Sequence, residues 1–278
     1  MNEIRPTIAD VQTRELLYYD KQFKKECYEF CVLREIDCLP AIGDSSKFHR
    51  RNDEIQGFDE LEISDDRRTD GSTFIFRPDI LNRFEEHPLL FVFNQGELTG
   101  VIHFSDYNRD AVNTYLFAQI SRYERALRSL LIASDLKNED MINFFCHQIN
   151  DQIKVNSYKR KKSQFENKYK GKLSLPEFQS FDLIDLIELA NWIENEVEVI
   201  QIDKSTYDLR NFVAHSVDTV SMKNARTPDY IFEFESFRQF FERVQTMLND
   251  CQRINNRLSL LPNRKEKPLE QIDSQASG

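Results

Sequence analysis

The sequence contains no long apolar run. No segment approaches the roughly 18–20 consecutive apolar residues that cross a bilayer, and the opening residues lack the apolar stretch of a secretory signal. Glycine and proline are scarce, at 7 and 8 of 278 residues, which excludes collagen-like chains and Gly/Pro-rich disordered chains. We therefore expect a folded, soluble protein that resides in the cytoplasm and has no membrane partner.

Disulfide and metal-binding cysteine patterns are also missing. The five cysteines are an odd number scattered over a long chain, unlike the framework of a small secreted domain. Cys27, Cys31 and Cys38 are close in sequence but include no Cys-x-x-Cys pair, and only His49 is near enough to complete a zinc site. We expect reduced thiols, no metal centre and no cofactor.

An excess of basic residues is absent as well. The chain has 37 Lys and Arg against 47 Asp and Glu, a net charge of −10, and such a balance counts against a nucleic-acid partner. The acidic excess is uneven, however. Residues 1–111 hold 14 basic and 23 acidic side chains, net −9, whereas residues 112–278 hold 23 and 24, net −1. The objection to nucleic acid therefore applies only to the first part.

The length and the apolar pattern predict two domains and a mixed α+β fold. In the first domain, the elements that periodicity and turn residues indicate are a helix at 10–36, a strand at 38–44, an irregular polar insertion at 49–72, a short helix at 78–84, and a hairpin of strands 89–93 and 98–104. In the second, helical spacing predicts helices near 115–131, 138–157, 183–197, 205–217 and 237–251. We expect domains at 1–111 and 112–258 and a disordered tail at 259–278.

The second strand of the predicted hairpin carries a family resemblance. Gly100, Val101 and Ile102 are followed by Ser105 and Asp106, and a helix pattern comes next. This order resembles the second repeat of a CBS domain pair, and residues 39–42 resemble the matching strand of a degenerate first repeat. The resemblance implies that Ser105 and Asp106 contact the phosphate and ribose of an adenine nucleotide. The alternative is a domain that dimerises or recognises a target without a nucleotide.

The predicted helix 205–217 has polar side chains on its outer face. Ser205 to Asp208 match the start of a capping box. At 100° per residue, Leu209 and Val213 lie on the apolar face, while Asn211 and His215 point away from it. Arg210 lies on the flank, about 140° from His215.

This segment, from Arg210 to His215, resembles the Arg-x4-6-His signature of HEPN domains, and the resemblance covers about residues 112–258. It implies an all-α bundle and a metal-independent endoribonuclease of the toxin or phage-defence type, in which Arg210, Asn211 and His215 are catalytic. Because one helix does not easily close Arg210 and His215 around one phosphate, a homodimer with a composite site is expected. The expected partners are RNA and an antitoxin or effector protein.

Two alternatives stay open at this point. The chain is also compatible with a non-catalytic dimeric HEPN/CBS scaffold that binds an adenine nucleotide or a protein partner. Arginine is common in this sequence, so the second alternative is a chance spacing, with Arg210 and His215 as part of a polar dimer or solvent face.

A basic run offers an RNA-binding surface in the second part. Residues 158–172 hold seven basic side chains against one Glu and are interleaved with aromatic residues. Phosphates of single-stranded RNA take the charge, and bases stack on the rings. The alternative is a solvated helix end and loop. The residues assigned to RNA are Lys159, Arg160, Lys161, Lys162 and Tyr169.

Overall fold

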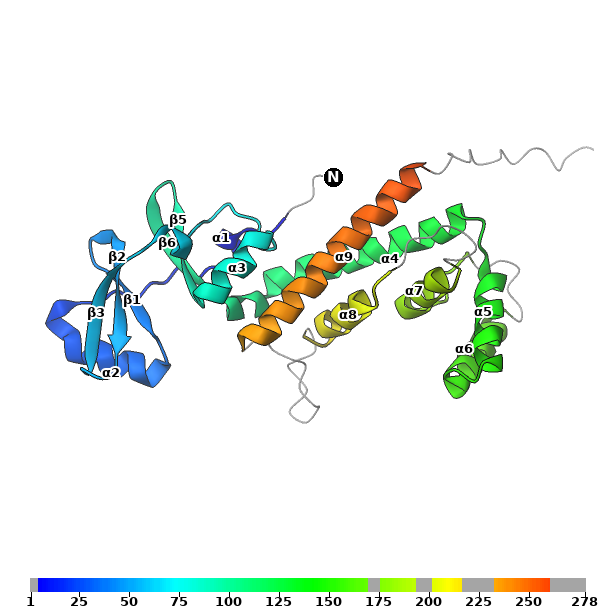
Figure 1. The fold of residues 1–278 in the computed structure, drawn as a ribbon, viewed down its shortest axis with the longest axis horizontal. Coiled ribbons are helices and arrows are strands. Elements are labelled where there is room, and N and C mark those ends of the chain that lie inside the picture. Colours follow the sequence, from blue (N-terminus) through cyan, green and yellow to red (C-terminus); the bar gives the residue numbers. More distant parts are fainter. Residues whose placement is uncertain (1–4, 170–175, 194–201, 217–232, 261–278) are drawn as a thin grey trace, which may run out of the picture. The chain divides into compact units, whose positions relative to one another are not determined.

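The computed structural model describes residues 5–169, 176–193, 202–216 and 233–260. The expected α+β class is confirmed in its coarse form, with small sheets in the N-terminal part and helices in the C-terminal part (Figure 1). The helices are α1 (Ile8–Val11), α2 (Lys24–Arg34), α3 (Pro78–Glu86), α4 (Asp110–Ala133), α5 (Asn138–Asn150), α6 (Val155–Tyr169), α7 (Leu183–Trp192), α8 (Ser205–Ser216) and α9 (Phe234–Leu260). The strands are β1 (Cys38–Ala41), β2 (Asp44–Asn52), β3 (Gly57–Glu62), β4 (Arg68–Asp70), β5 (Leu89–Asn94) and β6 (Glu97–His103).

The chain forms two compact units, and each of them combines two separate segments of the sequence. The first unit takes residues 1–120 and 208–246, and the second takes residues 121–207 and those from 247 on. The expected domains, 1–111 and 112–258, are continuous in sequence, whereas each of these units joins two separate segments.

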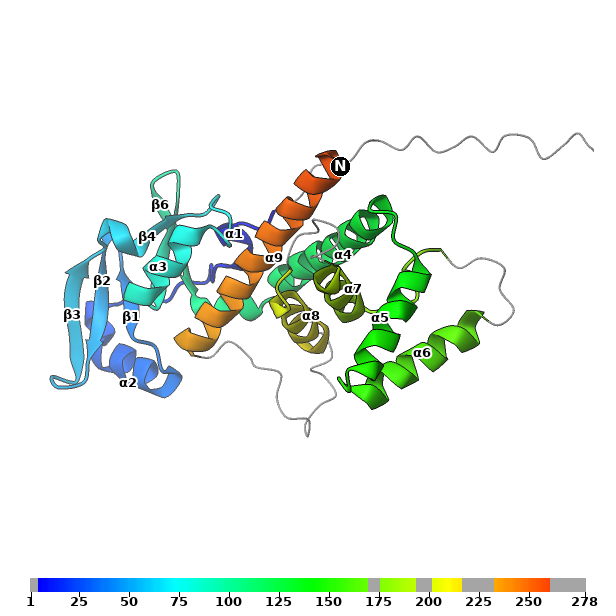
Figure 2. The ribbon, with the colours of Figure 1, turned by 45° about the vertical axis from the view of Figure 1, so that its right-hand side comes forward.

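The first sheet is antiparallel, with the order β1-β2-β3. Gly43, at φ 74°, makes the tight turn between β1 and β2, where the left-handed backbone favours glycine. Helix α2 packs against this sheet (Figure 2). Their shared core consists of Tyr19, Cys31, Leu39 and Phe58.

Two predictions about this region are wrong. The expected helix at 10–36 is interrupted, because the segment between α1 and α2 pairs with strands: Thr13 bridges Val101 and Tyr19 bridges Ala41. These backbone hydrogen bonds outweigh a weak helical preference. The expected insertion at 49–72 is instead largely strand, in β2, β3 and β4. Most side chains of β2 and β3 are exposed or half-buried, which explains why the sequence of this hairpin is so polar.

The second sheet has the order β4-β5-β6, with β4 parallel to β5 and β6 antiparallel to it. The predicted β5–β6 hairpin is confirmed. Its turn residues Gln95 and Gly96 both have positive φ, 52° and 87°, as a type I′ hairpin turn requires. Helix α3, also predicted, connects β4 to β5 and packs on β5. The two sheets meet through Phe48 and Phe91, whose ring centroids are 5.1 Å apart.

An aromatic core joins the N-terminal segment of the first unit to the first half of α9. Phe237 lies 5.3 Å from Phe84 and 4.9 Å from Tyr107 between ring centroids, and Phe241 lies 5.7 Å from Phe76. All five rings are buried. Burial of this aromatic surface explains why residues 208–246 belong to the same unit as residues 1–120.

The second unit is built on helices α5, α6 and α7. The expected helix at 138–157 ends at Asn150, because Gln152 and Lys154 have positive φ, and α6 starts afterwards. The predicted pair between Glu124 and Arg128 is present. Among the described residues, none of the helices combines the length and apolar character needed to cross a bilayer. The first two residues of the expected disordered tail, 259 and 260, belong to α9 instead, and the rest of that tail, 261–278, lies outside the described residues.

Candidate functional site

Helix α8, which carries the predicted catalytic residues, begins at Ser205 as expected. Its cap differs from the expected capping box: the Asp203 carboxylate accepts the backbone N–H of Ser205 at 2.6 Å. The Ser205 hydroxyl is buried and makes no hydrogen bond among the described residues. The first turn is therefore capped by the residue two positions before the helix, where an anion also interacts favourably with the helix dipole.

The buried face of α8 is the one that the helical spacing predicts. Leu209 and Val213 are buried, Arg210 is exposed and Asn211 is half-buried. The Arg210 Nη1 donates to Asn211 Oδ1 at 3.3 Å. His215 lies within the bounds of α8, but its side chain is outside the described residues. The structure thus brings Arg210 and Asn211 together on the solvent side of the helix.

The basic run forms helix α6, and its lysines are divided between solvent and ion pairs. Lys159 and Arg160 are exposed. Lys161 pairs with Asp185, whose side chain is only 4% exposed, and Lys162 donates to Cys146 Sγ at 3.2 Å and pairs with Glu166 at 3.9 Å.

The aromatic residues of the same run are mostly turned inward. Tyr158 and Phe165 are buried, and Phe165 stacks on Phe181 with centroids 4.8 Å apart. Their rings belong to the core of the second unit. The side chain of Tyr169 lies outside the described residues. Among the described side chains of this run, the exposed basic groups are therefore Lys159 and Arg160.

Ser105 and Asp106, the predicted nucleotide ligands, take part in a local turn. Ser105 Oγ lies 2.8 Å from His103 Nδ1, and the Ser105 N–H donates to the same nitrogen at 3.2 Å. Asp106 accepts the His103 N–H at 2.8 Å and two N–H groups of Arg109 at 2.7 and 3.0 Å. These bonds cap the short 3₁₀ helix Phe104–Asn108 that leads into α4.

A buried carboxylate in the second unit was not anticipated. Glu188 is 8% exposed and lines a pocket of about 300 Å³. Tyr158 Oη donates to it at 2.6 Å, and the ammonium groups of Lys154 and Lys204 each lie at 3.2 Å. Burial opposes ionisation, but these three donors outweigh it and hold the pKa of Glu188 below its usual value. The sequence signal is a pair of acidic residues, Asp185 and Glu188, inside a helix that is otherwise mostly apolar.

For Asp185, one turn earlier on α7, the effects of burial and of the neighbouring ammonium group on the pKa balance the other way. Here burial is the larger effect and raises the pKa of the carboxyl above its usual value, while the Lys161 ammonium opposes it. The two acids therefore tie α6 to α7 through one ion pair, Lys161 with Asp185, and one hydrogen bond, from Tyr158 to Glu188.

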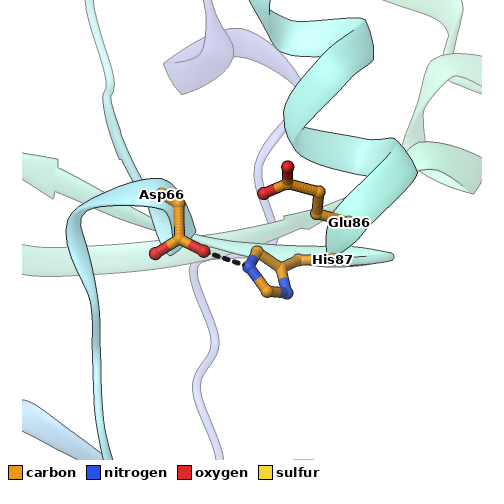
Figure 3. A group of neighbouring side chains, drawn as sticks. All are labelled: Asp66, Glu86 and His87. Atoms are coloured by element: carbon orange, nitrogen blue, oxygen red, sulfur yellow. Dashed lines mark hydrogen bonds and ion pairs between the residues drawn. The ribbon is translucent and has the colours of Figure 1, made fainter.

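A cluster of three side chains could hold a divalent cation. Asp66, Glu86 and His87 each offer one ligand atom, and these atoms lie within 4.8 Å of one another. Figure 3 shows the Asp66 carboxylate directed at the His87 ring, with Glu86 beside them. Hydrogen bonds from the Ser64 hydroxyl and from His87 lower the pKa of Asp66 to about 2. One imidazole and two carboxylates suit zinc and similar ions. Sequence reasoning missed this group because its members come from two separate segments.

Comparison with known proteins gives no family assignment. No protein-family model matches the chain, and no curated protein or solved structure is similar to it. The functional interpretation therefore depends on the side chains and geometry of this chain.

Proposed function

We propose that the protein is a metal-independent endoribonuclease of the HEPN type, with Arg210, Asn211 and His215 at its reacting centre. The observation that carries the proposal is the contact between the exposed Arg210 and the half-buried Asn211, while Leu209 and Val213 of the same helix are buried. An exposed guanidinium beside an amide is available to an RNA phosphate, whereas side chains buried in packing contacts are not.

The residues suit cleavage by the RNA's own 2′-hydroxyl. His215 takes the 2′-hydroxyl proton, the 2′-oxygen bonds to phosphorus, and the bond from phosphorus to the 5′-oxygen breaks. The leaving 5′-oxygen takes a proton from the imidazole of a second copy or from water, and the product ends in a 2′,3′-cyclic phosphate. Imidazole exchanges protons near neutral pH. The Arg210 guanidinium stabilises the negative charge that develops on the phosphate oxygens.

The site is completed by a second copy of the chain. Arg210 and His215 are about 140° apart around the helix axis at 100° per residue. Two α8 helices related by a two-fold axis bring an arginine from one copy toward a histidine from the other. In this arrangement Asn211 orients the phosphate or the imidazole, and Lys159 and Arg160 bind the RNA backbone.

The N-terminal part would control or target the nuclease as a CBS-like domain. The order β5, turn, β6, 3₁₀ helix and α4 supports this proposal, because it is the order of a second CBS repeat. A toxin or phage-defence role, with an antitoxin or effector as protein partner, belongs to the same proposal.

The test is cleavage of labelled RNA by the purified full-length protein in EDTA. We expect products with 2′,3′-cyclic phosphate ends, and a fall of about 10²-fold or more in rate for Arg210→Ala and His215→Ala, the scale of general acid–base catalysis. Arg125→Ala is the matched control, because Arg125 is exposed on α4 and has no role in the proposal. Circular dichroism checks that each variant is folded.

A mixture of variants tests the composite site. Arg210→Ala and His215→Ala chains, unfolded together and refolded as mixed dimers, should regain a fraction of the wild-type rate, because one interface then holds both intact residues. Wild-type rates in either single variant, or intact RNA after incubation with wild-type protein, would overturn the nuclease proposal. Intact RNA would favour the non-catalytic dimeric scaffold that binds an adenine nucleotide or a protein partner.

A further inference from the structure

A pocket of about 360 Å³ lies in the first unit where β4, α3 and the β5–β6 hairpin meet. Its lining includes three guanidinium groups, of Arg68, Arg77 and Arg83, together with Asp70 and Phe93. The volume is within the range of small-molecule sites. The sequence did not single out these residues, because they come from three elements.

The arginines are held in place by neighbouring groups. Arg83 donates to the backbone carbonyl of Arg68, whose own Nε donates to the Ile63 carbonyl at 3.0 Å. The Arg68 guanidinium lies 5.1 Å from the centroid of the Phe93 ring. A side chain that is already ordered loses little entropy when a ligand binds.

Arg77 and Arg83 converge on one carboxylate. Arg77 binds Asp79 through two of its nitrogens, and the Arg83 Nε lies 3.6 Å from the same carboxylate. A guanidinium has five N–H groups, so these contacts leave donors on both side chains. Asp79 therefore orients both guanidinium groups. It occupies the Nε and Nη2 edge of Arg77, while Nη1 of Arg77 and Nη2 of Arg83 lie outside these contacts.

The pocket is positively charged within an acidic part of the chain. Its three arginines outnumber the two aspartates beside them, Asp70 in the lining and Asp79 on Arg77, whereas residues 1–111 as a whole have a net charge of −9. Arginine forks match the geometry of a phosphate group, which accepts two parallel N–H bonds. A phosphate is thus the anion that this lining fits.

Asp70 adds a second requirement that a ligand of this pocket must meet. Its carboxylate accepts the Ser72 N–H at 2.7 Å and the Ser72 hydroxyl at 2.5 Å, and these bonds lower its pKa, so it stays ionised. A carboxylate only accepts hydrogen bonds. It repels a bare anion and favours a ligand that also presents hydroxyl groups.

We propose that this pocket binds a phosphorylated sugar, either free or as part of a nucleotide. The phosphate lies on Arg77 and Arg83, and a sugar hydroxyl donates to Asp70. This site is separate from Ser105 and Asp106, and it does not depend on the nuclease proposal.

Isothermal titration calorimetry of the full-length protein tests the site with ribose 5-phosphate, adenosine 5′-monophosphate, inorganic phosphate and ribose. We expect binding of at least one of the two phosphorylated sugars, with ribose and inorganic phosphate at least about tenfold weaker, since each lacks one charge-assisted contact. Tighter binding of adenosine 5′-monophosphate than of ribose 5-phosphate would identify the ligand as a nucleotide. Equal or weaker binding would identify the free sugar phosphate.

Arg77→Gln should weaken binding about tenfold or more, the scale of a charged hydrogen bond. Arg50→Gln, an exposed arginine on β2, should leave binding unchanged. Arg210→Ala should also bind as the wild type does, which separates this site from the nuclease centre. Equal binding by Arg77→Gln and wild type, or no heat with either phosphorylated sugar, would overturn the proposal. Inorganic phosphate that binds as tightly as the sugar phosphate would overturn the role of Asp70.

Discussion

Tyr158 donates its phenolic hydrogen to Glu188 at 2.6 Å, and both side chains are buried in the second unit. The bond connects the first turn of α6 to the middle of α7. Burial, followed by the hydrogen bond to the Glu188 carboxylate, raises the pKa of Tyr158 above its usual value, so the phenol stays protonated as the donor. A polar contact of this kind stabilises the fold chiefly because breaking it leaves a buried charge short of a donor.

Tyr158→Phe should therefore lower the free energy of unfolding by about 1.5–3 kcal/mol, the range for hydrogen bonds to charged groups. The phenylalanine keeps the ring contacts with Phe144 and Phe145. Urea unfolding followed by the fluorescence of the single tryptophan, Trp192, measures the change. Tyr18→Phe, at an exposed position, is the control and should stay within about 0.5 kcal/mol of wild type. A Tyr158→Phe variant as stable as that control would show that the lysines alone satisfy Glu188.

Gly100 is expected to be intolerant of a side chain. A Cβ at this position would lie 2.7 Å from the Thr13 carbonyl and would also collide with Gln12. Thr13 and Val101 exchange backbone hydrogen bonds of 2.8 and 3.0 Å at this point. Gly100→Ala must displace that pairing, at a cost of about 1–3 kcal/mol, as for other overpacked sites.

The matched control for this change is Gly71→Ala, where the nearest atom to the added Cβ is 3.5 Å away. It should alter stability by no more than about 0.5 kcal/mol. Thermal unfolding of both variants gives the comparison. If Gly100→Ala unfolds at the same temperature as the wild type, residues 12 and 13 do not hold the β6 backbone as closely as the structure indicates.

Acidification should destabilise the first unit through His103. Burial lowers the pKa of His103 below its usual 6.5, while Asp106 opposes the shift. The folded protein therefore favours the neutral ring, whose Nδ1 accepts the Ser105 N–H. The unfolded chain binds the proton more readily, so this stabilisation is present above about pH 6.5 and is lost as the pH falls through the lower folded-state pKa.

The measurement is the free energy of unfolding of wild type and His103→Asn between pH 7 and pH 5. The wild type should lose stability across this range, and the variant should lose less, since its amide does not titrate. Part of the slope should persist in the variant, because burial also lowers the pKa of His49. Identical slopes for the two proteins would contradict the assignment to His103.

Elements with a strong local signal were predictable. The Gln95–Gly96 turn between two apolar runs specified the β5–β6 hairpin, and the apolar spacing around Leu209 and Val213 specified which face of α8 is buried. The Glu124–Arg128 pair followed from its i,i+4 separation. In each case the interacting residues are near one another in sequence, so the local backbone alone determines the contact.

Elements whose conformation depends on distant partners were not predictable. Thr13 and Tyr19 are extended because they bridge strands, although the surrounding residues have helical spacing. The polar stretch after His49 forms strands because β2 pairs with β1 and β3. Most of its side chains stay exposed or half-buried, so its polar sequence is equally typical of a loop.

The sequence by itself determined which charged and polar groups are present and where they lie along the chain. These are an acidic N-terminal part, a basic run at residues 158–172, and Arg210 and Asn211 away from the apolar centre of helix α8. Only the tertiary structure decided which charges are available. It paired Lys161 with Asp185, and it gathered Arg68, Arg77 and Arg83 around one pocket. The physical reason is that helical periodicity fixes the direction in which a side chain leaves its helix. The charged group that pairs with that side chain comes from another segment of the chain.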